Sequence, residues 1–207
     1  MGDPPPQVPY SVPPGVEMVR NWIAKLPERT GRSLEEWIEH IKAEGPDTEA
    51  SRREWLKTEH GFGTNNALWL AQRCDGKGIE DEDDSSYLVA ASEWVETMFA
   101  AKKTFLRPIY ESLLSLGLSL GEDVKVCPCK TIVPLYRKHV FAQLKATTNT
   151  RLDLGLALRD LPATTRLIDT GGLLKKDRIT HRIALKTVDE IDDEVKHWLL
   201  MAYDLDA

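Results

Sequence analysis

Positively charged side chains are concentrated in one stretch of an otherwise acidic chain. The 207 residues have a formal net charge of −6 at pH 7. Between Glu122 and Lys186, thirteen Lys and Arg stand against six Asp and Glu, which leaves an excess of seven positive charges. A local positive field attracts polyanions whatever the net charge of the protein. The cations that we expect to meet a nucleic-acid backbone are Lys130, Arg137, Lys138, Lys145, Arg151, Lys175, Lys176, Arg178 and Arg182.

A second candidate contact is the glycine-containing turn within His60–Ala67, whose sequence is HGFGTNNA. Its spacing resembles the hairpin of helix-hairpin-helix proteins. There the glycines permit a tight turn, and backbone N–H groups at the start of the next helix meet a phosphate. Gly61, Gly63 and Thr64 are therefore candidate anion-binding residues, although uncharged residues replace the usual small basic ones. The alternative is a packing corner between two helices with a glycine at a C-cap.

A third candidate is the loop Asp169–Arg178, with the sequence DTGGLLKKDR. A glycine pair followed by Lys175, Lys176 and Arg178 can offer backbone donors and cations to an anion. The same sequence is also typical of an ordinary flexible loop between strands, and both interpretations stay open.

The only cysteine pair is Cys127-Pro-Cys129. On an extended segment, alternate residues point to one face, so two thiols could share a metal ion. A closed zinc site needs two further ligands, and no other Cys or His has a recognisable zinc-ribbon spacing. We therefore interpret these residues as small semi-buried thiols beside a strand-edge proline, and we expect no metal and no cofactor.

No catalytic residues can be assigned from motifs. The G-x-S-x-G, P-loop, H-E-x-x-H and dinucleotide-binding patterns do not occur. Glu122, Asp123 and Lys125, together with Lys145 or Asp153, could form a metal-dependent nuclease site. Because acid-x-Lys is a common pattern, the nuclease is kept only as an alternative.

Helical periodicity extends over residues 16–73. Ser33 can cap a helix, and Glu36 three residues later completes a capping box. The apolar residues of this helix recur on one face, at Leu34, Trp37, Ile38 and Ile41. A second helix is expected from Thr48 to about Glu59, and a third follows the glycine turn. The sequence thus predicts a three-helix N-terminal unit.

The pattern changes to strand after Gly121. In one run Leu152, Leu154 and Leu156 alternate with polar or small residues, as expected for a strand with one buried face. Runs of this kind, separated by hairpin-sized gaps, indicate an antiparallel meander. The predicted strands are 131–136, 140–145, 151–156 and 178–186, preceded by helical sequence over 87–120 and followed by a helix over 189–203. Pro108 predicts a break in the preceding helical sequence near residues 105–107.

These elements define an α+β protein in which a small N-terminal helical bundle precedes an antiparallel-sheet domain flanked by helices. The predicted domains are a disordered Pro-rich tail over 1–15, a helical domain over 16–73, an acidic linker over 74–86 and an α+β domain over 87–207. No apolar run approaches the length of a membrane span, and three cysteines argue against a disulfide scaffold. We therefore expect a cytoplasmic protein.

The helical half resembles the bacterial family domain of unknown function 4287. The resemblance is carried by a T-G-x-S-x-x-x-W opening at Thr30–Trp37 and a W-L-x-x-x-H-G-x-G-x-x-x-A stretch at Trp55–Ala67. This likeness implies a small helical module and assigns no activity.

The second half resembles domain of unknown function 5655, also an uncharacterised bacterial family. The matching segments are 131–136, 141–145, 151–156 and 189–194, together with Tyr203. The resemblance implies an α+β module similar to parts attached to restriction-type and other DNA-associated proteins.

The leading hypothesis is a non-enzymatic binding module that contacts a nucleic-acid backbone through a basic sheet and its loops. One alternative is a protein–protein interaction or scaffold protein, with a protein partner or a second copy of the chain. The other is the metal-dependent nuclease. A membrane partner is not expected.

Overall fold

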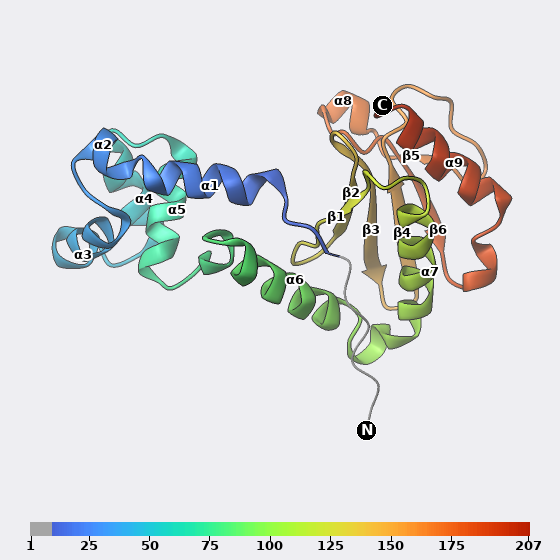
Figure 1. Cartoon of the computed structure of the whole chain (residues 1–207), viewed down its shortest axis with the longest axis horizontal. Coiled ribbons are helices and arrows are strands. Elements are labelled where there is room, and N and C mark those ends of the chain that lie inside the picture. The colour runs from blue at the N-terminus through green and yellow to red at the C-terminus, as the bar shows by residue number, and fades with distance from the viewer. Residues whose placement is uncertain (1–9) are drawn as a thin grey trace. The chain divides into compact units, whose positions relative to one another are not determined.

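The structure, a computed structural model, describes residues 10–207; residues 1–9, which hold most of the predicted Pro-rich tail, lie outside the described residues. The chain divides into two compact units. The helical unit comprises residues 12–90, and the sheet unit comprises residues 91–207 together with Tyr10 and Ser11. Figure 1 follows the element order from the helices to the sheet, and the α+β class is confirmed.

Five α-helices, rather than the three predicted, precede residue 75 in the described part of the helical unit. They are α1 (Pro14–Ala24), α2 (Leu26–Thr30), α3 (Leu34–Glu44), α4 (Glu49–Thr58) and α5 (Thr64–Cys74). Helix α1 begins at Pro14, inside the predicted tail, and Pro27 lies in the first turn of α2. Proline fits the first helical turn because its missing N–H has no intrahelical partner there.

Local capping positions these helices as the sequence predicts. The Ser33 hydroxyl accepts from the Glu36 N–H, and the Glu36 carboxylate accepts from the Ser33 N–H at 2.7 Å, so the capping box is confirmed. Thr48 caps α4 by accepting from the Ser51 N–H. The core of this unit is formed by Leu26, Leu34, Trp37, Ile41, Leu56, Ala67, Leu70 and Ala71.

The acidic segment 74–86 is folded in the structure. It contains the 3-10 helix η1 (Ile79–Asp81) and the first turn of α6 (Asp84–Met98). The buried Arg73 side chain forms an ion pair with Glu82 at 3.0 Å and donates to the Lys77 carbonyl at 2.9 Å. The division into two units falls between residues 90 and 91, inside α6.

An antiparallel sheet in the order β1-β2-β3-β4-β6-β5 forms the centre of the sheet unit. Its strands are β1 (Lys125–Val126), β2 (Val133–Tyr136), β3 (Val140–Thr148), β4 (Arg151–Leu156), β5 (Ile168–Asp169) and β6 (His181–Leu185). The four longer strands are those predicted. The two-residue strands β1 and β5 and the short helix α8 (Gly172–Lys175) have too few residues to show a period, and the sequence analysis missed them.

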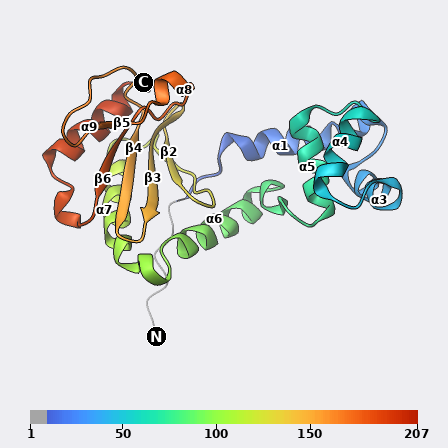
Figure 2. The ribbon, with the colours of Figure 1, turned by 180° about the vertical axis from the view of Figure 1, so that it is seen from behind.

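Helices α7 (Arg107–Leu118) and α9 (Asp193–Asp204) cover one face of this sheet (Figures 1 and 2). The core between them includes Leu113, Leu144, Leu154 and Leu199, all fully buried. Pro108 lies in the first turn of α7, after the 3-10 helix η2 (Ala101–Leu106), so the predicted break is confirmed. None of the described helices is long and apolar enough to cross a bilayer.

Candidate functional site

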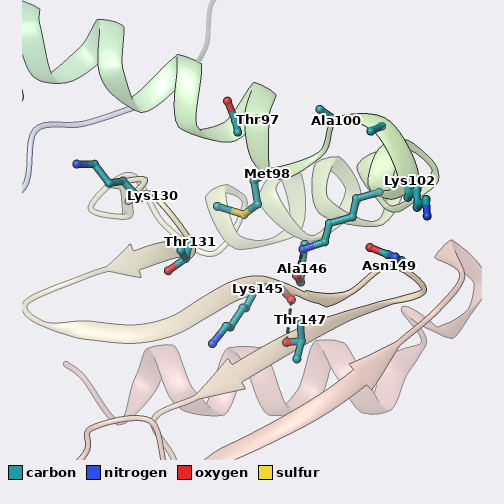
Figure 3. A pocket seen from close by; sticks show the side chains of 12 residues that line it. Thr97, Met98, Ala100, Lys102, Lys130, Thr131, Lys145, Ala146, Thr147 and Asn149 are labelled. Carbon is teal, nitrogen blue, oxygen red and sulfur yellow. Dashed lines mark hydrogen bonds between the residues drawn. The ribbon is translucent and has the colours of Figure 1, made fainter.

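A lysine-lined cleft of about 670 Å³ lies in the sheet unit. One side is formed by the end of α6 and by η2, and the other by the β1–β2 loop, strand β3 and the β3–β4 turn (Figure 3). Four lysines and no acidic residue line it; the full lining is Thr97, Met98, Ala100, Ala101, Lys102, Lys103, Lys130, Thr131, Lys145, Ala146, Thr147 and Asn149. We call this feature the lysine cleft.

The four lysines are held differently. Lys103 Nζ donates to the Ala146 carbonyl at 2.6 Å, which ties η2 to β3. Lys130 Nζ lies 5.8 Å from the ring centroid of Trp94, within the range of a cation–π contact. The side chains of Lys102 and Lys145 are exposed. In the view of Figure 3, Lys130 is at one end of the cleft and Lys102 at the other, and the Lys145 side chain extends from β3 away from Met98.

Asp153, which lies opposite Lys145 on the neighbouring strand β4, already has positively charged partners. Asp153 is the Cα partner of Lys145 and is buried. It forms ion pairs with Arg151 at 2.9 Å and Arg182 at 3.4 Å, and it accepts from the Thr147 hydroxyl at 2.7 Å. Arg151 and Arg182 were predicted to contact nucleic acid. In the structure they instead form ion pairs with the buried Asp153 carboxylate.

Arg137 is likewise held within the sheet unit. Its guanidinium lies 2.7 Å from the Asp123 carboxylate and 4.1 Å from the centroid of the Tyr203 ring. The Tyr203 hydroxyl donates to the same carboxylate at 2.7 Å. These bonds from Arg137 and Tyr203 hold the pKa of Asp123 below its usual value.

Arg178 is paired with Asp206, whose side chain is 3% exposed. Asp206 also accepts from the His139 N–H at 2.7 Å and lies 3.0 Å from His139 Nδ1. Burial alone would raise the pKa of Asp206, but the His139 hydrogen bonds and the Arg178 charge outweigh it and lower that pKa. A smaller cleft of about 220 Å³ lies beside this cluster, where Arg159 and Arg178 face Asp177 and Asp206.

In the glycine-containing loop before β6, hydrogen-bond donors of the loop already bond to acceptors of the same loop. The Gly171 N–H donates to the Asp169 carboxylate at 2.7 Å, and Lys175 Nζ donates to the Thr170 carbonyl at 3.3 Å. Lys176 is exposed at a positive φ of 56°. Lys138 is exposed in the turn between β2 and β3. Neither Lys138 nor the loop lysines line the lysine cleft.

The turn at residues 60–64 has the geometry that its glycines suggest. Gly61 adopts a φ of +68°, and Gly63 is the N-cap of α5. The Phe62 N–H donates to the Leu56 carbonyl at 3.0 Å, which closes the turn onto α4. Thr64 is exposed at the first position of α5. An anion contact here stays a prediction.

The residues considered for metal or nuclease chemistry lie in separate surroundings. Cys127 is buried and burial raises the pKa of its thiol to about 12, whereas Cys129 is exposed. Asp123 and Asp153 each have their own arginine partners. Within residues 10–207, no group of three or more His, Cys, Asp or Glu side chains is placed to hold a metal ion.

Only two of the predicted cations, Lys130 and Lys145, are brought together in the lysine cleft. Lys102 and Lys103 complete it, and sequence analysis missed them because they lie outside the basic stretch. The available signal was the adjacent lysine pair just before the break at Pro108.

The fold and the cleft together define an α+β protein with a cationic groove beside an antiparallel sheet. Residues 95–206 match the family Domain of unknown function (DUF5655), and residues 19–76 match Domain of unknown function (DUF4287). The first match covers more than half of the chain, so the protein belongs to the DUF5655 family. No curated protein and no solved structure matches the chain.

The residues that carry the DUF4287 resemblance build the core of the helical unit. Trp37 Nε1 donates to the Thr30 hydroxyl at 2.8 Å. His60 packs edge-on against Trp37 and Trp55, with ring centroids 5.0 and 4.3 Å away. Burial lowers the pKa of His60, and His40 nearby adds to the effect. This part of the pattern is therefore explained by packing.

Proposed function

We propose that the sheet unit binds a nucleic-acid backbone through the lysine cleft. The observation that carries this proposal is a cleft of about 670 Å³ lined by four lysines and no acidic side chain. The ammonium group of lysine is a compact point charge that pairs well with a phosphate oxygen. Local charge of one sign in a concave surface concentrates anions even on a protein of net charge −6.

The arrangement of the lysines favours an extended anion. In Figure 3, Lys130 and Lys102 lie at opposite ends of the cleft and the Lys145 side chain extends from β3 away from Met98, so the three side chains do not converge on one point. A small anion would be held best by converging donors, whereas a strand of phosphates can meet several separated cations. Thr131, Thr147 and Asn149 add neutral hydrogen-bonding groups to the lining. Such groups commonly contact phosphate and sugar, which position a nucleic acid without reading its sequence.

The proposal includes a cytoplasmic location, where nucleic acid and a reducing environment occur together. The sparse and odd count of three cysteines, Cys74, Cys127 and Cys129, supports it, because disulfide scaffolds are typical of oxidising compartments.

Fluorescence anisotropy with a labelled DNA duplex of mixed sequence, titrated at about 50 and about 200 mM salt, tests this function. The double variant Lys130→Gln/Lys145→Gln removes two cations of the cleft. We expect weaker binding and a slope of log affinity against log salt reduced by about 2. The matched control is Lys138→Gln/Lys186→Gln, which removes two exposed lysines of the same basic stretch outside the cleft.

Equal losses in the two double variants would show that net charge, and not the cleft, governs binding. Absence of binding by the unmodified chain at the lower salt concentration would overturn the proposal. Unfolding midpoints of both variants, measured alongside, verify that the fold is intact.

A further inference from the structure

The helical unit has a cleft of its own, unrelated to the lysine cleft. It has a volume of about 330 Å³ and lies where α1, α2 and α5 meet. Two tryptophans, two cations and three amides dominate its lining, which consists of Met18, Asn21, Trp22, Lys25, Arg29, Asn65, Asn66 and Trp69. We call this feature the tryptophan cleft.

The polar side chains of the tryptophan cleft are not used by the fold. Lys25 and Arg29 make no side-chain hydrogen bond or ion pair with residues 10–207. The same holds, within that described range, for the side chains of Asn21, Asn65 and Asn66. No acidic residue lines the cleft. Its charge and its amide groups are thus presented to a ligand, in contrast to the arginines of the sheet unit.

The aromatic part of the lining offers a surface for a flat ring. The centroids of Trp22 and Trp69 are 5.4 Å apart, and the ring planes are inclined by 64°. Both indoles are only half-buried, and the adjacent residue Met18 is 60% exposed. Aromatic side chains beside Lys and Arg are the combination that holds an unpaired base by stacking and its phosphate by charge.

We infer that the tryptophan cleft binds one unpaired nucleotide of a nucleic-acid single strand. The base packs against Trp22 and Trp69, and Lys25 and Arg29 meet the flanking phosphates. The amides of Asn65 and Asn66 lie at the same cleft and can pair with the polar edge of the base. The inference shares its ligand class with the function proposed for the sheet unit but depends on none of the same residues.

Two labelled single strands of equal length, about 12 nucleotides, separate stacking from charge. One carries thymine bases, and the other is abasic, so that it keeps every phosphate and lacks every base. We expect Trp69→Leu to weaken binding of the thymine strand about tenfold. Binding of the abasic strand is expected to stay unchanged, because leucine alters no charge.

The charged half of the site has its own variant, Lys25→Gln/Arg29→Gln. Both side chains are exposed, so the fold does not depend on them. We expect binding of both strands to weaken and the salt slope to fall by about 1.4, the value for two contacts to a single strand. The matched control is Lys42→Gln/Arg53→Gln, which changes the charge of the helical unit equally but lies outside the cleft.

Two outcomes would overturn the inference. The first is an equal effect of Trp69→Leu on the thymine and abasic strands, and the second is an equal loss in the cleft and control double variants. The test of the tryptophan cleft can be kept apart from the test of the lysine cleft. For this purpose the Trp69→Leu comparison is repeated in the Lys130→Gln/Lys145→Gln background. A base-dependent loss there supports the tryptophan cleft whether or not the lysine cleft contributes.

Discussion

The arginines of the basic stretch and the lysines of the lysine cleft lie in two different surroundings. Near the C-terminal end of the sheet unit, Arg137 is held by Asp123 and the Tyr203 ring, and Arg178 is held by Asp206. Arg166 similarly meets the Asp192 carboxylate at 2.5 Å. In the lysine cleft, by contrast, the lining contains four lysines and no acidic side chain.

The difference follows from side-chain chemistry. The planar guanidinium presents several N–H groups in a fixed fork that matches a carboxylate, so arginine is suited to hold elements of a fold together. Lysine has a flexible stem and a strongly hydrated charge, and it is easily left at the surface. The excess of seven positive charges in residues 122–186 counts arginine and lysine equally. This count therefore overstates how many of the charges can face a ligand.

The largest expected effect is a loss of folding stability when the carboxylate that pairs with Arg178 is removed. Asp206→Ala removes a buried carboxylate from Arg178 and from the His139 N–H. We expect the free energy of unfolding to fall by about 2 kcal/mol, because the Arg178 guanidinium and the His139 N–H both lose hydrogen bonds to a charged carboxylate. The measurement is urea unfolding followed by circular dichroism. Asp204→Ala, an exposed acid at the end of α9 and two residues before Asp206, is the matched control and should change stability little.

Nucleic-acid affinity of Asp206→Ala should match that of the unmodified chain at a temperature where both are folded. If this variant lost affinity while its fold stayed intact, the ion pair of Arg178 with Asp206 would contribute to binding as well as to stability, contrary to our expectation.

The next effect is on binding. Lys102 lies outside the basic stretch but inside the lysine cleft. We expect Lys102→Gln to reduce the salt slope of duplex binding by about 1, because one phosphate contact is lost. Unfolding should be unchanged, since the side chain is exposed. If Lys176→Gln, an exposed lysine inside the stretch, had the larger effect, the position in the sequence would matter more than the cleft.

A smaller effect on stability is expected from a substitution that keeps the positive charge of Arg137 but removes its planar guanidinium. Arg137→Lys cannot reproduce the paired contacts with Asp123 and the Tyr203 ring. We expect a lower thermal midpoint and an unchanged salt slope of binding. Lys138→Arg, a charge-preserving change in the same turn, is the control and should alter neither quantity.

The smallest effect is confined to acidic pH. The pKa of Asp206 is lowered in the folded state, so its contribution to stability is present above the ordinary aspartate pKa of about 3.9. This contribution is lost as the pH falls through the lower folded value. Urea midpoints measured from about pH 6 to about pH 3 should therefore fall more steeply for the unmodified chain than for Asp206→Asn. Parallel curves would show that this carboxylate does not titrate differently on folding.

Elements with a strong local signal were predictable. The capping box of Ser33 and Glu36 satisfies backbone groups within four residues, and Pro108 restricts its own neighbours. The alternation at Leu152, Leu154 and Leu156 likewise reports a strand with a buried face. Strands β1 and β5 were missed because two residues cannot show a period; they exist only because β2 and β6 offer them hydrogen bonds.

The lysine cleft was predictable only in part. Lys130 and Lys145 were singled out by charge, but Lys102 lies twenty residues before the start of the basic stretch at Glu122. The tryptophan cleft was not foreseen, because residues 18–29 and 65–69 meet only when the helices pack. Residues that meet in this way share no local pattern.

Local chemistry in the chain specifies the α+β class, the family, the main helices and strands, and a local excess of positive charge. These properties depend on side-chain period, turn residues and composition, which are read over a few residues at a time. Tertiary packing decides which charged groups meet. It pairs arginines such as Arg178 with distant acids such as Asp206, and it gathers lysines from η2, the β1–β2 loop and β3 into one cleft. The physical reason is that charge pairing depends on distance in space, and the order of residues does not contain that distance.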